Sequence, residues 1–268
     1  MLSPTWKEPE PKMDGLVFGL CALIGLAATA LSAREAWRQR DRSDFRVARF
    51  TRAVAIGICT MGVTFAVPAV ENAIESATGM NNAVKLGAHI CAVVWCGSLQ
   101  LMMVDWSYNH EVLKASLYAR IALAVCVLTA MLPLFVNTTD GSVEFTTEYA
   151  VVPGVTVYLM VYLGYVAITC GEIAFLCTGM ALVARRAGHT WSARGLGLSS
   201  ISAVLGVAYA ASKGSYLVTH YLGHPWPLRY EEIVSPLLAG LAVISLITGL
   251  TMAMIGKRLA SRVAASTT

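Results

Sequence analysis

The chain alternates between long apolar stretches and short polar segments, and seven of the apolar stretches stand out. A helix needs roughly 20 consecutive apolar residues to cross a bilayer core about 30 Å thick, and each stretch reaches about that length. The pattern therefore predicts an all-α protein with seven membrane-spanning helices, over residues 15–33, 53–76, 84–105, 117–136, 153–183, 196–222 and 232–256. The segments between them are too short for a second domain, so we expect one helical domain over residues 1–268.

Two prolines fall well inside these stretches, Pro68 in the second and Pro133 in the fourth. A proline inside a helix removes one backbone hydrogen bond and bends the helix. In the second stretch, we expect this bend to swing Glu71 and Asn72 into the bundle.

Composition agrees with a membrane protein, since 56% of the residues are hydrophobic and 13% are charged. The connections on one side of the predicted helices carry fifteen lysines and arginines, against five on the other side. Because cytoplasmic loops carry the excess of Lys and Arg, we expect the N-terminus outside and the C-terminus inside a cytoplasmic membrane. The net charge of +4 follows from these loops, so it gives no reason to expect a nucleic-acid partner.

Several chemical classes lack their sequence motifs. The chain has no Gly-x-Ser-x-Gly, no His-Glu-x-x-His, no P-loop and no Asp-Asp-x-x-Asp pair, which disfavours nucleophilic hydrolysis and magnesium-dependent diphosphate chemistry. The seven cysteines all fall inside predicted spans without a Cys-x-x-Cys, so we expect small core residues rather than disulfides or a zinc site. We therefore expect no metal and no cofactor.

Ionisable side chains inside a span are costly, and one that faces the bundle interior is a functional hypothesis by default. At about 100° per residue, Glu71 and Asn72 share one side of the second span with Pro68. We expect Glu71 to face inward and to be held uncharged, so that it can donate a proton. The alternative is a structural ion pair with Lys85 or Lys213.

The third span places His89, Cys96 and Gln100 on one face, with Trp95 beside it, and ends at Asp105. A lone histidine in a span is more often a packing residue than a ligand, yet His89 and Trp95 are candidates for contact with a substrate. Two interpretations of Asp105 stay open. It is either a catalytic acid or an interfacial residue at the water boundary, where aromatic residues such as those of the DWSYNH segment gather.

The fifth span carries a stripe of tyrosines that leads down to a carboxylate. Its residues are spaced by four, three, four and three positions: Tyr158, Tyr162, Tyr165, Thr169 and Glu172. Such a stripe indicates either helix packing or the lining of a cavity. Glu172 lies well inside the apolar stretch, so it must find a partner or stay protonated.

The sixth span repeats the pattern, and three of its residues are candidates for substrate contact: Tyr209, Lys213 and Tyr216. Lys213 is also expected as the counter-charge that holds Glu71 or Glu172 in place. Glu231 and Glu232 begin the last span, where the helix dipole favours acidic residues whatever the protein does.

An apolar interior with isolated carboxylates and many aromatic rings suits one type of chemistry. A carboxylic acid kept protonated by an apolar site is a strong proton donor, and the faces of aromatic rings attract cations. Together these groups can protonate an olefin or an epoxide and guide the resulting carbocation. Lipophilic substrates would enter from the membrane lipid.

Two stretches, AVPAVENAIESATGMNNAVKLGAHICAVVW and ARGLGLSSISAVLGVAYAASKGSYL, resemble an actinobacterial group of seven-span integral membrane proteins. Within it, the pair Glu71–Asn72 followed by Asp105–Trp106 is similar to the small membrane-bound terpene cyclases of bacterial indole-terpenoid pathways, the drimentine type. The resemblance extends over the second to sixth spans and rests on short motifs. It implies metal-independent, proton-initiated cyclisation of a prenyl chain already attached to an aromatic or amino-acid-derived head. It also places Glu71 and Asn72 in the site and makes Asp105 a candidate.

The sequence thus predicts a membrane cyclase for a lipophilic, prenylated substrate. Glu71 would donate the starting proton, Asn72 would hold its orientation, and Glu172 or Asp105 would take the final proton or supply a second acid. The path of the cation would be lined by Trp95, Tyr158, Tyr162 and Tyr209. No acidic residue of the last span is matched to the family pattern. The alternative is a transporter or receptor that uses the carboxylates and Lys213 as a relay or a ligand pocket.

Overall fold

The computed structural model describes residues 13–38, 46–79, 82–107, 110–138 and 150–266, and nearly all of these residues are helical. No strand occurs in the described ranges, so the all-α prediction is confirmed. The helices in chain order are α1 (Met13–Arg38), α2 (Arg46–Phe65), α3 (Pro68–Thr78), α4 (Ala83–Ser107), α5 (His110–Thr138), α6 (Pro153–Arg186), α7 (Thr190–Tyr221) and α8 (Leu228–Ser266).

Six of these helices are long and apolar enough to cross a membrane, namely α1, α4, α5, α6, α7 and α8. The pair α2 and α3 passes the same test together and would make a seventh, broken span. The outer faces carry large exposed apolar side chains, among them Phe175 at 79% and Leu23 at 67%. Lipid accepts such a surface and water does not, so the chain is a multi-pass membrane protein. The orientation of its termini stays a prediction.

The second predicted span is broken rather than bent. α2 ends at Phe65 and α3 starts at Pro68, with an angle of 80° between the two helices. Val67, the residue before the proline, has extended backbone angles of φ −79° and ψ 119°, because the proline ring disfavours a helical conformation at that position. Pro68 itself fits the first turn of α3, where its missing N–H is not needed. By contrast, α5 continues through Pro133.

The short helix α3 ends close to the start of α4, and hydrogen bonds at Gly79 and Asn82 define this corner. It ends at Gly79, whose left-handed backbone (φ 68°) is typical of a glycine at a helix C-terminus. The Gly79 N–H donates to the Glu75 carbonyl oxygen at 2.8 Å. The Glu75 carboxylate accepts a hydrogen bond from the Asn82 N–H at 2.7 Å, just before α4 begins. This corner places Glu71, in the first turn of α3, beside the start of α4.

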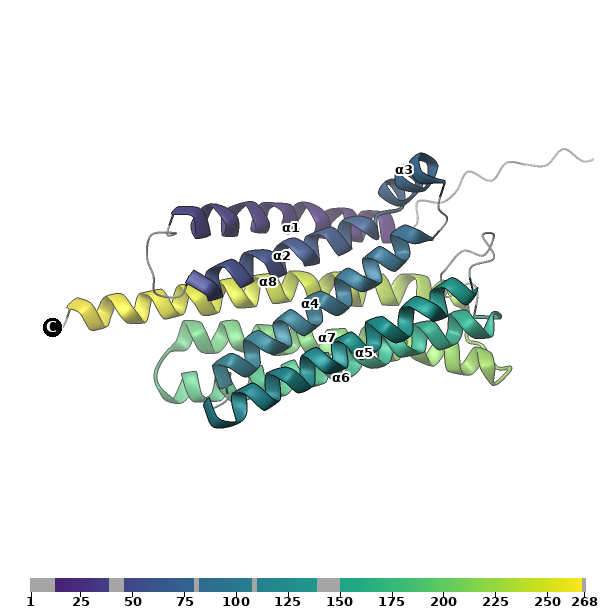
Figure 1. Cartoon of the computed structure of the whole chain (residues 1–268). Helices are drawn as coiled ribbons and strands as arrows, with labels where there is room; N and C mark the ends of the chain where they lie inside the picture. The colour runs from purple at the N-terminus through teal and green to yellow at the C-terminus, as the bar shows by residue number, and fades with distance from the viewer. Residues whose placement is uncertain (1–12, 39–45, 80–81, 108–109, 139–149, 267–268) are drawn as a thin grey trace, which may run out of the picture.

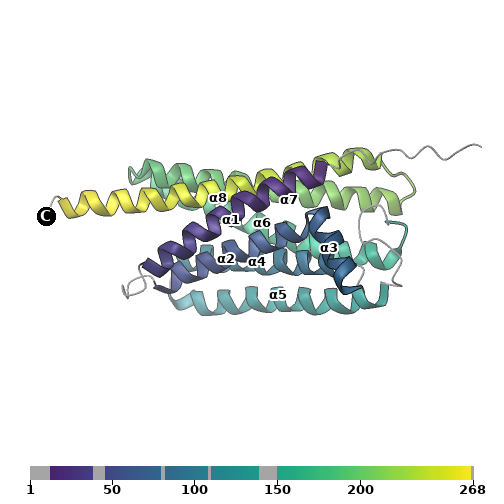
Figure 2. The same cartoon turned by 90° about the horizontal axis from the view of Figure 1, so that it is seen from above.

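Six helices form a closed ring in the order α1, α2, α4, α6, α7, α8 and back to α1, each packing against the next (Figures 1 and 2). α5 lies outside this ring against α4 and α6, and α3 lies at one end of it. The most extensive contact joins α7 and α8, where small residues let the backbones approach. A Cβ atom added to Gly195 would lie 2.3 Å from the Ala253 nitrogen. The order of the ring decides which side chains face its interior.

Candidate functional site

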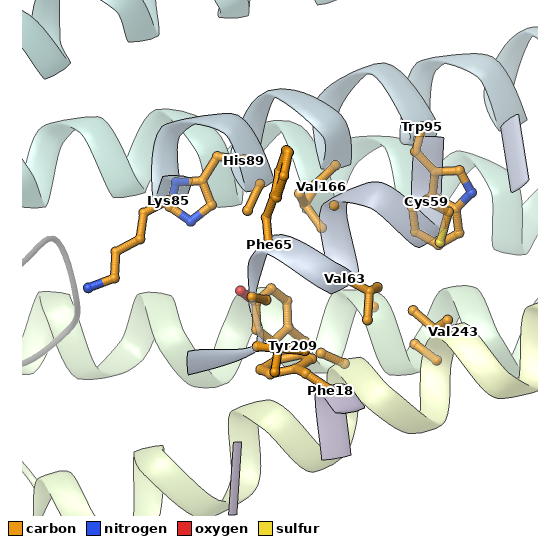
Figure 3. A pocket seen from close by; sticks show the side chains of 18 of the residues that line it. Phe18, Cys59, Val63, Phe65, Lys85, His89, Trp95, Val166, Tyr209 and Val243 are labelled. Atoms are coloured by element: carbon orange, nitrogen blue, oxygen red, sulfur yellow. The ribbon is translucent and has the colours of Figure 1, made fainter. Parts of the chain in front are cut away.

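The ring encloses a cavity of about 1230 Å³ that every described helix except α5 lines. Most of the wall is apolar, and aromatic rings approach from several sides (Figure 3). These rings come from five helices: Phe18, Phe65, Trp95, Tyr162 and Tyr209, together with the imidazole of His89. A mostly apolar cavity with a few convergent polar groups is the usual form of a small-molecule site.

Glu71 and Asn72 both lie in the cavity wall, in agreement with the predicted inward orientation. The Glu71 Oε1 atom lies 3.0 Å from the Lys85 Nζ atom, and the side chains are 16% and 15% exposed. This ion pair needs an ionised carboxylate, so it differs from the expected uncharged acid. The cause is the break before α3, which turns Glu71 toward the first turn of α4. The structural alternative, a pair with Lys85, is the one observed.

His89 forms part of the wall, and a buried tyrosine forms a hydrogen bond with its ring. Its Nδ1 atom lies 2.9 Å from the Tyr158 hydroxyl oxygen, and its ring stacks on Tyr162 with a centroid distance of 4.4 Å. Tyr158 is fully buried and does not line the cavity. It packs behind the histidine that does face the cavity, and its predicted place along the path of a cation stays a prediction.

The remaining tyrosine candidates divide between the wall and the core. Tyr209 lines the cavity, as does Trp95. Tyr165 and Tyr216 do not line it, and their assignment as substrate-binding residues stays a prediction. The Tyr165 hydroxyl donates to the Val93 carbonyl oxygen at 3.4 Å, and Tyr216 packs edge-on against an indole ring. Both tyrosines fill space between helices.

Glu172 also lies outside the cavity wall. Its carboxylate accepts hydrogen bonds from Gln100 and from the Arg120 guanidinium, whose Nε atom lies 3.0 Å from Oε1. Glu172 follows Tyr162 by ten residues, and at 100° per residue it points about 80° away from that tyrosine. The stripe therefore leads toward α5 rather than into the ring. Glu172 finds a partner, and that partner is Arg120.

Asp105 lies in the last turn of α4 with an exposed side chain and no place in the cavity wall. Its neighbour Trp106 is 45% exposed, as the interfacial interpretation of the DWSYNH segment expects. The two acids predicted to take the final proton, Asp105 and Glu172, are therefore both absent from the cavity wall, and their catalytic role stays a prediction.

The sequence interpretation missed the partner of Lys213. Its Nζ atom lies 3.6 Å from Glu231 Oε1, so the expected pairing with Glu71 or Glu172 is wrong. Glu231 is only 2% exposed, which the dipole of a helix start does not explain. Helical phase would have found it, because steps of four, four, three and four residues connect Glu231 to four inward-facing residues of α8: Ser235, Ala239, Ala242 and Leu246.

The cysteines mostly behave as small core residues, since Cys21, Cys59, Cys91, Cys96 and Cys177 are buried and unpaired by disulfides. Cys126 is the exception, with an exposed side chain on α5. Cys96 and Cys170 lie in the cavity wall. Within the described ranges, no three His, Cys, Asp or Glu side chains gather closely enough to hold a metal ion.

Comparison with known proteins finds no match to this chain among protein-family models, curated proteins or solved structures. The chemistry of the site therefore rests on its own geometry. That geometry combines a mostly apolar cavity, aromatic faces, a hydrogen-bonded pair of His89 and Tyr158, and one carboxylate–ammonium pair in the wall.

Proposed function

We propose that this protein is an integral membrane cyclase that folds and closes a prenyl chain carried by an indole or a similar head group. The observation that supports this most is the cavity, which is enclosed by apolar helices and carries the Glu71 carboxylate in its wall. Its volume of about 1230 Å³ exceeds the 300–1,000 Å³ that is typical of ligand pockets, by roughly a quarter at the upper end. A folded prenyl chain and a head group fit that size class.

The proposed reaction is a proton-initiated isomerisation. In the reacting state the ion pair of Glu71 with Lys85 is open and Glu71 has taken up a proton. Its carboxyl group adds that proton to one carbon of an olefin, and the adjacent carbon becomes a cation. The next double bond attacks that cation, so a carbon–carbon bond forms while a π bond is lost. The last cation releases a proton to a base in the wall, for which His89 is the candidate. No atom is gained or lost, and with an epoxide the ring oxygen would become a hydroxyl.

The wall supports the intermediate steps. Aromatic faces attract cations by about 0.5–2 kcal/mol each, and Trp95, Tyr162 and Tyr209 line the cavity on three different helices. A bound apolar substrate would displace water from this mostly apolar wall, and water would otherwise capture the cation. Asn72 lies in the same wall next to Glu71 and is proposed to orient its carboxyl group.

Turnover by isolated membranes tests the proposal. Membranes that contain the protein are incubated with farnesylated and with geranylgeranylated indoles, and products are separated and analysed by mass spectrometry. The expected product has the mass of the substrate, a different retention time and fewer double bonds. Membranes with the Glu71→Gln variant, extracted to confirm that the protein is folded, should form almost none. Turnover by Glu71→Gln at the wild-type rate would end the assignment.

Transport or ligand sensing is a second candidate function, and two features favour it. The α2–α3 break is 80°, and helices interrupted beside a binding cavity are common in transporters. Two lysines also line the cavity, and each lies close to a carboxylate: Lys85 to Glu71 and Lys213 to Glu231. Uptake of a labelled prenylated indole into vesicles, without chemical change, would support this candidate against the cyclase.

A further inference from the structure

The wall of the cavity changes in character from one end to the other. Its carboxylates, lysines and histidine gather toward α3, and they are Glu71, Glu75, Lys85, His89 and Lys213. Further along α4 the lining residues are Ala92, Trp95, Cys96 and Leu99. In Figure 3, Lys85 and His89 lie at one end of the lining group, and Trp95, Cys59 and Val243 lie at the other. The end away from α3 is therefore the apolar end.

Four helices, α4, α6, α7 and α8, end the cavity together on its apolar side. Each contributes a buried apolar side chain to the lining, and these are Leu99, Ile173, Ala203 and Leu246. All four belong to one hydrophobic cluster, whose other buried members do not line the cavity: Met103, Cys177 and Leu250. We call Leu99, Ile173, Ala203 and Leu246 the floor.

The turn of helix beyond the floor is tightly packed. Met103 and Cys177 each follow a floor residue by four positions, and their sulfur atoms lie 3.6 Å apart between α4 and α6. On α7 and α8 the corresponding residues are Ser199 and Gly249, and a Cβ atom added to Gly249 would lie 2.6 Å from the Ser199 Oγ atom. Met103, Cys177 and Ser199 are all 0% exposed. Between these four helices, a chain that reaches the floor cannot pass beyond it.

We propose that the floor receives the far end of a ligand's apolar chain, and that Ala203 limits the length of that chain. The ligand class is an amphipathic molecule with a prenyl-type chain, bound with its head group toward α3 and its chain toward the floor. The inference rests on the proposed function for the choice of a prenyl chain. It does not depend on the reaction.

The depth of the apolar end suits a chain of farnesyl length. Leu99 follows His89 by ten residues, which at 1.5 Å per residue is about 15 Å along α4. The extended polypeptide backbone advances about 1.2 Å per bond, so at the same advance an isoprene unit with its four bonds covers about 5 Å, and about three units cover 15 Å. A farnesyl chain with its head group beside His89 therefore reaches the floor, whereas a geranyl chain ends above it.

Ala203 is the floor residue at which chain length is most easily changed. It has the smallest side chain of the four, whereas the other three helices contribute leucine or isoleucine. Because Ala203 borders the cavity, a larger side chain there can extend into open space and raise the floor. Gly206, nearly one turn away on α7, is a poorer choice, since an added Cβ atom would lie 2.7 Å from the Cys170 Sγ atom.

Binding of three alcohols tests the inference. Geraniol, farnesol and geranylgeraniol share a hydroxyl head group, and each is longer than the one before by one isoprene unit. The full chain is placed in nanodiscs, and binding of the labelled alcohols is measured after subtraction of empty nanodiscs. Longer alcohols partition more strongly into lipid, so each variant is compared with wild type for the same alcohol.

The variant Ala203→Leu should weaken the binding of farnesol and geranylgeraniol about tenfold and leave geraniol unchanged. Loss of roughly two buried CH₂ groups gives a change of that size. The matched control is Ala210→Leu, because Ala210 lies on the same helix, is 4% exposed against 5% for Ala203, and does not line the cavity. Ala210→Leu should lower thermal stability but keep the relative affinities for the three alcohols.

A variant that lowers the floor tests the same inference in the opposite direction. Leu246→Ala opens space at the apolar end, so the preference for geranylgeraniol over farnesol should rise several-fold. If Ala203→Leu does not fold, Leu246→Ala decides alone, and an unchanged preference in that variant overturns the inference.

A membrane lipid could supply the same chemistry, since an acyl chain is also long and apolar. Dodecanol has as many carbons along its main chain as farnesol but lacks the methyl branches and the double bonds. Unlabelled dodecanol and unlabelled farnesol are compared as competitors of labelled farnesol, at equal mole fractions in the nanodisc membrane. Stronger displacement by farnesol supports a prenyl chain, and equal displacement overturns that choice in favour of an acyl chain.

The outcomes distinguish this inference from the proposed function. Folded Ala203→Leu protein that binds all three alcohols as wild type does, or that loses geraniol as much as farnesol, overturns the inference. An equal change of preference in Ala210→Leu does the same, even if prenylated indoles are cyclised. Conversely, a length preference that depends on the floor, in a protein that cyclises nothing, supports the inference and removes the cyclase.

Discussion

Two regions of the bundle each hold a carboxylate against a basic side chain, and they differ in what lies beside the pair. At the α3 end, Glu71 meets Lys85 at 3.0 Å and both side chains line the cavity. Between α4, α5 and α6, Glu172 meets Arg120 and Gln100 and lies outside the cavity wall. The first pair adjoins the cavity, whereas the second lies outside its lining. A carboxylate in a span therefore marks a candidate site only where a cavity adjoins it.

The largest expected effect is a difference in turnover between variants of Glu71 and of Glu172. A single positioned acid contributes about 10²–10⁴-fold in rate, so Glu71→Gln should lower the rate of cyclisation by that factor. Glu172→Gln, with rates expressed per mole of folded protein, should stay close to wild type because its side chain does not reach the cavity. Product formation from a farnesylated indole gives both rates. Equal losses in the two variants would remove the distinction between the regions.

The next effect concerns stability, where we expect the Glu172–Arg120 pair to matter more than the Glu71–Lys85 pair. Arg120→Met leaves the Glu172 carboxylate without its cation in a part-buried position, and the loss of one partner of a buried pair costs about 3–5 kcal/mol. Lys85→Met should cost less, because the cavity can admit water to Glu71. Thermal unfolding in detergent compares the two variants.

A double variant serves as the control for this comparison. Arg120→Met/Glu172→Met removes both charges, and apolar replacement of a whole pair is often neutral, so it should recover most of the loss. A Lys85→Met variant that is destabilised as much as Arg120→Met would show that the cavity-side pair is as enclosed as the other.

The long spans were predictable because their length follows from the thickness of a bilayer. The apolar stretches over 153–183 and 196–222 correspond to α6 (Pro153–Arg186) and α7 (Thr190–Tyr221) within a few residues. The position of the break at Pro68 was predictable, but its angle of 80° was not. Pro133 has the same chemistry and leaves α5 continuous, so the surrounding packing decides between a bend and a break.

The pairing of charges was less predictable, because it depends on which helices are neighbours in the ring. Helical phase gives the face of a residue and says nothing of the helix opposite that face. Lys213 was expected to meet Glu71 or Glu172, yet α7 packs most closely on α8, which carries Glu231. Phase alone was sufficient to find Glu231 as an inward-facing residue. It was also sufficient to show that Glu172 points away from Tyr162.

The smallest expected effect tests the support behind the cavity wall. Tyr158→Phe removes the hydroxyl that lies 2.9 Å from the His89 Nδ1 atom, and one hydrogen bond contributes about 0.5–1.5 kcal/mol. His89 would keep its stacking on Tyr162 but lose a fixed ring orientation. Binding and turnover of the farnesylated indole should therefore fall modestly, together with stability. The matched control is Tyr165→Phe, whose hydroxyl makes a longer contact of 3.4 Å to Val93.

The two phenylalanine variants differ in what their hydroxyl groups support. Tyr158 holds a residue of the cavity wall, whereas Tyr165 joins two helices away from it. A purely structural role would lower the stability of both variants and leave the binding of the farnesylated indole unchanged. A role in the site predicts weaker binding in Tyr158→Phe alone. Equal weakening of binding by Tyr165→Phe would show that contact with a wall residue does not set Tyr158 apart from Tyr165.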